Sequence, residues 1–238
     1  MTQIQQHPKV TLIQHAGDDV MVAAAAKVST TGDEARDLER IEEEGGISGL
    51  IRYLMKHRHG SPFEHGMMTF FIHAPIFVIR ELQRHRIASY NEESGRYKQL
   101  EPVFWSPSDD RKISRPEDYK SARPTFDPGT PEQFALIRKH DELFDHLYAA
   151  YEEEIAAGIG NEIARRLLPL ATFSSVWVTM NPRGLMNFLS LRVHDPEATN
   201  VSYPQREIEE VAEQIEAAFA ELYPLTHKQF VKNGRVAP

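Results

Sequence analysis

Residues Arg84 to Tyr97 read R-H-R-I-A-S-Y-N-E-E-S-G-R-Y, fourteen residues with three arginines and two glutamates. Burying so many charges is unfavourable unless each one has a partner, and arginine binds phosphate through two parallel hydrogen bonds. Ser94 and Gly95, next to Arg96, favour a turn in which a hydroxyl and a backbone N–H join the guanidinium. The stretch follows an apolar run at 76–79, which places it near the core. We therefore interpret it as an anion-binding segment rather than a solvated loop.

Outward from this stretch, the hydrophobic pattern predicts many helices and few strands. Apolar runs rich in β-branched or aromatic residues predict strands at 9–15, 67–73 and 174–180. Helical periodicity, with N-caps and glycine or proline stops, predicts helices at 20–29, 33–44, 47–57, 75–86, 132–157, 161–168, 181–192 and 205–223. The helix at 132–157 should present a stripe of Phe134, Ile137, Leu143 with Phe144, Leu147 and Tyr151. The proline-rich segment 101–131 reads as a long loop or insertion, and the whole pattern predicts an α+β fold.

The composition limits the class of protein. The chain has 238 residues, 41% of them hydrophobic, and a net charge of −8. This length favours a single domain spanning 1–238, and the acidic balance disfavours a nucleic-acid partner. We find no apolar run long enough to span a bilayer and no signal peptide at the N-terminus, so we expect a cytoplasmic protein with no membrane contact.

Four blocks of sequence carry a resemblance to a known family. Arg84-His85-Arg86, followed after seven residues by Ser94, resembles the RHR-x7-S signature of flavin-dependent thymidylate synthases. Upstream, 57–65 (H-R-H-G-S-P-F-E-H) resembles the family's H-x-[ST]-P-F-E-H segment. Downstream, 163–170 and 181–192 resemble its A-R-x-x-L-P and N-x-R-x-L-x-N-F-x-x-L-R segments. The blocks stand in the family's order and cover most of the chain.

The resemblance implies a fold, an assembly and a reaction. The fold is a small, mostly antiparallel sheet packed with several long helices, and flavin sites form between the subunits of a homotetramer. The reaction converts dUMP to dTMP, with 5,10-methylenetetrahydrofolate as the carbon donor and FAD and NADPH as the source of hydride. The chain contains no cysteine, so it cannot activate uracil by adding a thiolate.

The resemblance also assigns roles to residues. Arg192 is the catalytic residue, which polarises the pyrimidine and favours its ionised form. The residues implied for dUMP are Glu81, Arg84, Glu92, Ser94, Gly95, Arg96, Arg165 and Arg192. Those implied for FAD are His59, Ser61, Arg84, His85, Arg86, Glu92, Asn181, Arg183 and Asn187. No metal site is expected.

Other interpretations stay open. His57, His59 and His65 could be ligands of a metal-dependent nucleotide hydrolase, although no H-E-x-x-H frame accompanies them. A phosphate-binding or regulatory module could keep the fold without the reaction, and a nucleic-acid-binding protein is a third option. Arg192 could simply complement the negative end of its helix, and we expect Arg166 to be a surface or salt-bridge residue.

The chain departs from the family pattern in three places. The connection 193–204 is longer than usual, and either His194 or Tyr203 could supply the ring that the family often places there; the sequence does not choose between them. The segment 101–131 could act as a lid. Lys27 stands where the resemblance leads us to expect arginine.

Overall fold

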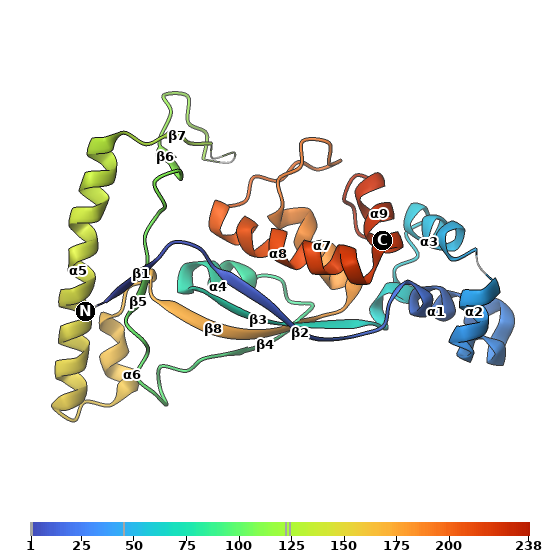
Figure 1. The fold of residues 1–238 in the computed structure, drawn as a ribbon, viewed down its shortest axis with the longest axis horizontal. Helices are drawn as coiled ribbons and strands as arrows, with labels where there is room; N and C mark the ends of the chain where they lie inside the picture. The colour runs from blue at the N-terminus through green and yellow to red at the C-terminus, as the bar shows by residue number, and fades with distance from the viewer. Residues whose placement is uncertain (1, 45, 122, 124) are drawn as a thin grey trace. The chain divides into compact units, whose positions relative to one another are not determined.

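The computed structural model describes residues 2–44, 46–121, 123 and 125–238 (Figure 1). The chain divides into two compact units, and we describe each by itself. Unit 1 comprises Met1–Lys9, His73–Leu82 and Glu92–Val176. Unit 2 comprises Val10–Ile72, Gln83–Asn91 and Trp177–Pro238.

The main sheet has four strands and is mostly antiparallel, in the order β2-β3-β8-β4. The strands are β2 (Lys9–Ala16), β3 (Met67–Pro75), β8 (Phe173–Met180) and β4 (Ser89–Glu92). On β8, Val176, Val178 and Met180 are buried at every second position, which is the period of a strand with one face against a core. The α+β class and the strands predicted near 9–15, 67–73 and 174–180 are confirmed.

Unit 2 holds most of the helices. They are α1 (Asp19–Thr31), α2 (Leu38–Glu44), α3 (Ile47–Lys56), α7 (Pro182–Arg192), α8 (Arg206–Leu222) and α9 (Pro224–Lys232), with the short 3-10 helices η1 (Gly32–Arg36) and η2 (Ser61–Glu64). On α8, the side chains of Ile208, Ile215 and Phe219 are fully buried at helical spacing. This helix packs against α7 and α9, and α3 packs against α9, so the elements that carry the C-terminal motifs share one core.

A buried carboxylate joins α1 to α9. Asp19, only 6% exposed, accepts hydrogen bonds from the backbone N–H of Leu225 at 2.6 Å, the backbone N–H of Thr226 at 2.9 Å and the Thr226 hydroxyl at 2.6 Å. The first turn of a helix has N–H groups without intrahelical partners. Asp19 therefore caps a helix that begins more than two hundred residues later in the chain.

Unit 1 is built around a long helix. It contains α4 (Ile76–Leu82), α5 (Pro131–Ala156), α6 (Asn161–Ala164) and the 3-10 turn η3 (Arg165–Leu167). Its short strands are β1 (Gln3–Gln5), paired in parallel with β5 (Val103–Trp105), and β6 (Lys112–Ser114), paired with β7 (Asp127–Pro128). Thr130 and Gln133 form a capping box at the start of α5. Where the structure describes the segment 101–131, it is thus mostly loop, as predicted, with three short strands.

Several predicted boundaries differ from the structure. The helix predicted at 75–86 runs only from Ile76 to Leu82, because Pro75 ends β3 and the arginine-rich residues leave the helix. The helix predicted at 33–44 is divided into η1 and α2, since the Asp37 carboxylate caps the new helix by accepting from the Arg40 N–H at 3.1 Å. Strand β1 and helix α9 were not predicted.

The prediction of the apolar stripe on α5 was wrong at Leu143. Phe144 stacks on Phe104 with ring centroids 4.8 Å apart, and Tyr151 is buried. Leu143, the neighbour of Phe144, is 53% exposed, because consecutive residues of a helix point in different directions. Within the described residues, no helix is long and apolar enough to cross a membrane.

The Asp19 contacts generate a stability prediction. Asp19→Ala leaves the buried Thr226 N–H and the part-buried Leu225 N–H without acceptors, and we expect it to lower the free energy of unfolding by about 2 kcal/mol or more. Asp18→Ala is the matched control, because Asp18 caps α1 through a single contact to the Met21 N–H and should cost about 1 kcal/mol. Urea unfolding of both variants measures the difference, and equal losses would contradict the role given to Asp19.

Candidate functional site

In unit 2, residues 84–88 of the predicted arginine-rich segment lie in the loop between α4 and β4. Arg84 and Arg86 are exposed on it, and the Ile87 side chain is 63% exposed. His85 is half-buried, and its backbone carbonyl accepts a hydrogen bond from the Tyr90 hydroxyl at 2.7 Å. This contact holds the loop so that its basic side chains point away from the core.

The loop lies directly against the first turn of α7. Asn181 caps this helix by accepting from the Gly184 N–H at 2.7 Å, and Pro182 occupies its first position. A Cβ atom on Gly184 would lie 2.8 Å from the carbonyl oxygen of Ile87, closer than real contacts allow. Glycine at 184 therefore permits the loop to approach the first turn of α7 at Ile87.

Arg183 extends from the same turn and is held on two sides. Its guanidinium donates to Glu64 at 2.5 Å and to the backbone carbonyl of Pro238 at 2.7 Å. Asn187 follows one turn later and donates to the Arg183 carbonyl at 3.2 Å, with its side chain exposed. Because Glu64 belongs to η2, this contact brings the segment with His59 and Ser61, both exposed, to the side of α7.

At the other end of α7, Arg192 meets His85. The Nε of Arg192 donates to the Nε2 of His85 at 3.0 Å, and the His85 ring packs edge-on against Phe188 at 4.9 Å. Arginine has no acceptor, so Nε2 carries a lone pair and the ring proton is on Nδ1. Burial, with a further contribution from Arg192, lowers the pKa of His85 to about 4. His85 is therefore neutral at physiological pH and orients Arg192.

The remaining predicted residues lie in unit 1. Ser94, Gly95 and Arg96 form a turn in which the Ser94 hydroxyl accepts from the Arg96 N–H at 3.3 Å. Gly95 is buried, and a Cβ there would lie 3.3 Å from Cδ of Arg165, so Arg165 lies beside this turn. Arg96 pairs with Glu162 of α6 at 3.0 Å.

Glu81 lies half-buried on α4, and Glu92 is exposed at the end of β4. The predicted residues thus divide between the two units. The unit 2 group is His59, Ser61, Arg84, His85, Arg86, Asn181, Arg183, Asn187 and Arg192. The unit 1 group is Glu81, Glu92, Ser94, Gly95, Arg96 and Arg165.

The arginines differ in whether a carboxylate neutralises them. Within the described part of the chain, Arg84, Arg86 and Arg165 have no carboxylate at ion-pair distance. Arg96 and Arg183 are paired with Glu162 and Glu64. Exposed guanidinium groups without a counter-ion are suited to bind an anion such as a phosphate.

Some expectations outside the two groups can also be compared with the structure. Arg166 forms an ion pair with Glu154, as expected of a surface residue. Among the described residues, no group of three histidine or carboxylate side chains is placed to hold a metal ion.

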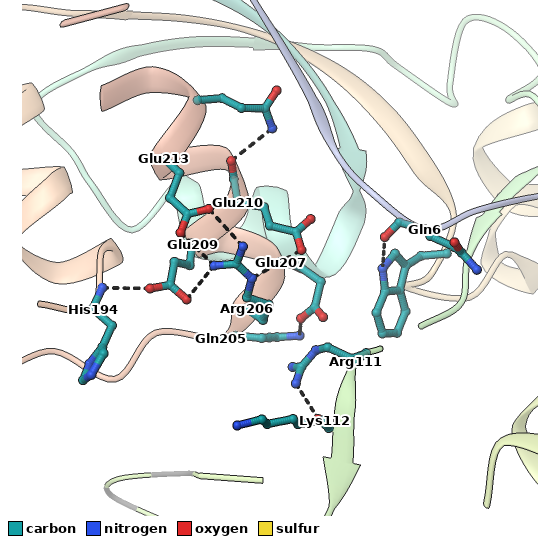
Figure 2. Close-up of polar contacts among 12 residues, drawn as sticks. Gln6, Arg111, Lys112, His194, Gln205, Arg206, Glu207, Glu209, Glu210 and Glu213 are labelled. Atoms are coloured by element: carbon teal, nitrogen blue, oxygen red, sulfur yellow. Dashed lines mark hydrogen bonds and ion pairs between the residues drawn. The ribbon is translucent and has the colours of Figure 1, made fainter. Parts of the chain in front are cut away.

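The connection after Arg192 is ordered by its own contacts. His194 and Tyr203 pack with ring centroids 5.2 Å apart, so the structure brings both candidate rings together and does not choose between them. The His194 N–H donates to Glu209 at 2.9 Å. Figure 2 shows that carboxylate as one of several on α8, including Glu213, that surround Arg206.

Glu162 and Glu64 pair with two of the arginines predicted for the site, Arg96 and Arg183. No pattern in the sequence indicates either pair. Glu162 lies 66 residues from Arg96, and Glu64 lies 119 residues from Arg183. Only packing brings such residues together.

The lowered pKa of His85 predicts a pH effect on stability. The unfolded chain protonates this ring below pH 6.5, whereas the folded protein resists protonation until about pH 4. Stability should therefore fall as the pH is lowered from 6.5 towards 4. In His85→Gln the side-chain oxygen takes the place of Nε2 and does not titrate, so its unfolding free energy should fall less. Urea unfolding of both proteins at pH 7 and pH 5 tests this, and identical losses would contradict a neutral His85.

Comparison with known proteins gives three concordant findings. The family described as thymidylate synthase complementing protein matches residues 11–225. The protein called flavin-dependent thymidylate synthase in Streptomyces avermitilis is 50% identical over 234 residues, which cover 96% of this chain and 93% of that protein. The protein of the same name in Streptomyces coelicolor is 48% identical, again over 96% of this chain and 93% of that protein. The crystal structure of the UMP/dUMP methylase PolB from Streptomyces cacaoi, bound with 5-Br dUMP, superposes with a TM-score of 0.90 at 43% identity, covering 99% of this chain and 100% of that one.

Proposed function

Because this chain belongs to the family of flavin-dependent thymidylate synthases, we propose that it methylates dUMP to dTMP. The carbon donor in this proposal is 5,10-methylenetetrahydrofolate, the cofactor is FAD and the reductant is NADPH. The observation that carries the proposal is the packing of the Arg84–Arg86 loop against α7, with Arg192 held by His85. That arrangement combines cations that have no carboxylate partner in the described chain, suited to phosphate groups, with a guanidinium held in a fixed direction.

The donor set of unit 2 fits a flavin dinucleotide. Arg84 and Arg86 are exposed and have no carboxylate partner in the described chain, so they can meet phosphate groups, and Asn187 offers an exposed amide. FAD, when bound, supplies the hydride and one-carbon chemistry. The residues proposed to hold it are His59, Ser61, Arg84, His85, Arg86, Glu92, Asn181, Arg183 and Asn187.

The nucleotide phosphate is the proposed ligand of the turn in unit 1. The Ser94 hydroxyl, the backbone at Gly95 and the Arg96 guanidinium supply donors on adjacent residues, and Arg165 lies beside them. The pair between Arg96 and Glu162 is more than half exposed, and such pairs contribute little free energy. A phosphate dianion can therefore take over Arg96 at small cost. Glu81, Glu92, Arg84 and Arg192 complete the residues proposed for dUMP.

Arg192 is the proposed catalytic residue. A guanidinium next to the uracil ring stabilises the base with N3 deprotonated, and the added electron density makes C5 a better nucleophile. His85 fixes the Nε edge of that guanidinium, so the opposite, forked edge is directed to the ring. No thiolate is required, which agrees with a chain that contains no cysteine.

Assembly completes the proposal. We infer a homotetramer with flavin sites between subunits, a single functional domain over 1–238 and a cytoplasmic location. Support for the assembly comes from large apolar side chains left exposed on one chain, among them Leu136 and Leu143 on α5, Trp177 on β8 and Leu191 on α7. Exposed apolar surface of this kind is typical of contacts between proteins.

The first test of the function is spectroscopic. The purified protein, supplied with FAD, should show flavin absorbance that NADPH bleaches without oxygen, faster when dUMP is present, and should form dTMP once methylenetetrahydrofolate is added. Arg192→Lys keeps the charge but loses the planar fork, and we expect dTMP formation to fall about 100-fold. Arg166→Lys, on an exposed surface pair, should not change it.

Three results would count against this function. A protein that binds dUMP but takes up no FAD would be a binding module without the reaction. Activity that chelators abolish and that needs no reductant would indicate the metal-dependent hydrolase. Full activity in Arg192→Lys would remove Arg192 from the catalytic role.

The Arg96–Glu162 pair gives a second prediction. Glu162→Gln should free Arg96 for the phosphate and lower the dissociation constant of dUMP about two- to fivefold, which is the range expected for an exposed pair. Glu154→Gln frees Arg166 on the neighbouring turn and should leave dUMP binding unchanged. Calorimetric titration measures both constants, and a weaker affinity in Glu162→Gln would show that the carboxylate supports the site.

A further inference from the structure

The end of α3 carries a group of aromatic rings that the core does not use. Tyr53 is 52% exposed. Its ring lies 4.4 Å from that of His57 and 5.6 Å from that of His59. Both histidines are exposed as well. Burial does not account for three rings clustered in solvent, but a flat ligand could use the apolar faces that they present.

The backbone at this cluster is in an unusual conformation. Among the described residues, only Arg58 and Arg235 have a positive φ without being glycine, at 57° and 56°. Arg235 is 6% exposed and is held by an ion pair to Glu216 at 2.7 Å. Arg58 follows the last turn of α3 at a position where glycine is usual, yet it is exposed and has no carboxylate partner in the described chain. Two backbone hydrogen bonds close α3 around Arg58, from the His59 N–H to the Leu54 carbonyl at 2.9 Å and from the Arg58 N–H to the Met55 carbonyl at 3.3 Å. The helix end thus accounts for the positive φ, and it leaves an exposed guanidinium at a position where glycine would carry no charge.

Positive charge gathers around the same rings. Arg52 and Lys56 lie one turn apart on the exposed face of α3, and with Arg58 they form three cations without a carboxylate partner in the residues described. Cations near a helix C-terminus complement its dipole. That effect accounts for Lys56, but it does not explain why the three rings are exposed beside these cations. In a chain with net charge −8, an unpaired basic cluster is suited to a particular anion.

We propose that the α3 basic surface (Arg52, Tyr53, Lys56, His57 and Arg58) binds the anionic tail of an aromatic co-substrate. The inference rests on the proposed function, because both co-substrates named there have this chemistry. A folate carries carboxylates on its glutamate tail, and NADPH carries phosphates. The surface leads through His59 to Ser61, both proposed to contact the flavin, so a ligand at the flavin can extend its tail along α3.

The key variant is Arg58→Gly. Glycine adopts a positive φ readily, so this change removes the charge without straining the fold, and the thermal midpoint should not fall. Each lost contact to an exposed charge should raise the KM for the co-substrate that binds here about threefold. The triple variant with Arg52→Gln and Lys56→Gln should raise it about tenfold or more, and this effect should shrink at high salt because the charges are screened. Arg36→Gln removes an exposed cation elsewhere in unit 2 that has no carboxylate partner among the described residues, and it should leave these KM values unchanged.

The FAD-loaded enzyme is assayed with two pairs of co-substrates. If the tail is that of NADPH, the variants lose the preference for NADPH over NADH, which lacks one phosphate. If the tail is that of the folate, they lose the preference for a triglutamate over a monoglutamate form. An unchanged KM for every co-substrate in the triple variant, with normal kcat and dUMP affinity, overturns the inference and leaves the proposed function standing. A wild-type protein that forms no dTMP defeats the proposed function itself.

Discussion

The hydrogen bond from Arg192 to His85 depends on the close approach of two segments. The loop that carries His85 reaches α7 because Gly184 has no side chain where the Ile87 carbonyl lies. Tyr90 holds that loop by its backbone, and Phe188 supports the His85 ring from α7. The Arg192 N–H needs an acceptor and the neutral His85 ring supplies one at Nε2. The same hydrogen bond therefore fixes the direction of the guanidinium and the protonation state of the imidazole.

The arginines of this protein fall into two kinds, those paired with a carboxylate inside the fold and those without such a partner in the described chain. Arg206 is surrounded by carboxylates on α8, Arg166 is matched by Glu154, and Arg235 is buried with Glu216. Their charges are neutralised within the fold and stabilise it. The cations of the Arg84–Arg86 loop and of the α3 basic surface have no such partners in the described chain. An acidic protein can bind anions in this way, because local clusters and not the net charge set the potential at a site.

Capping residues and hydrophobic periodicity predicted those helices and strands whose bounds depend on neighbouring residues in the chain. Asn181 and Pro182 placed the start of α7, and the period of two in 174–180 placed β8. Prediction failed where distant residues decide. Helix α9 begins at Pro224 with a cap from Asp19, at the opposite end of the chain, and α4 ends at Leu82 because the residues after it pack on α7. The inward residue of α5 is Phe144 and not Leu143, since Phe104 stacks there.

The sequence by itself determined the family, the fold class and the chemical character of the site, because these depend on residue types at fixed spacings. The tertiary structure decided which arginines are paired, that His85 is neutral and that Arg58 has no carboxylate partner among the described residues. Those properties depend on contacts between residues far apart in the chain. Burial and pairing arise only when packing brings such residues together, and no local pattern of residues specifies them.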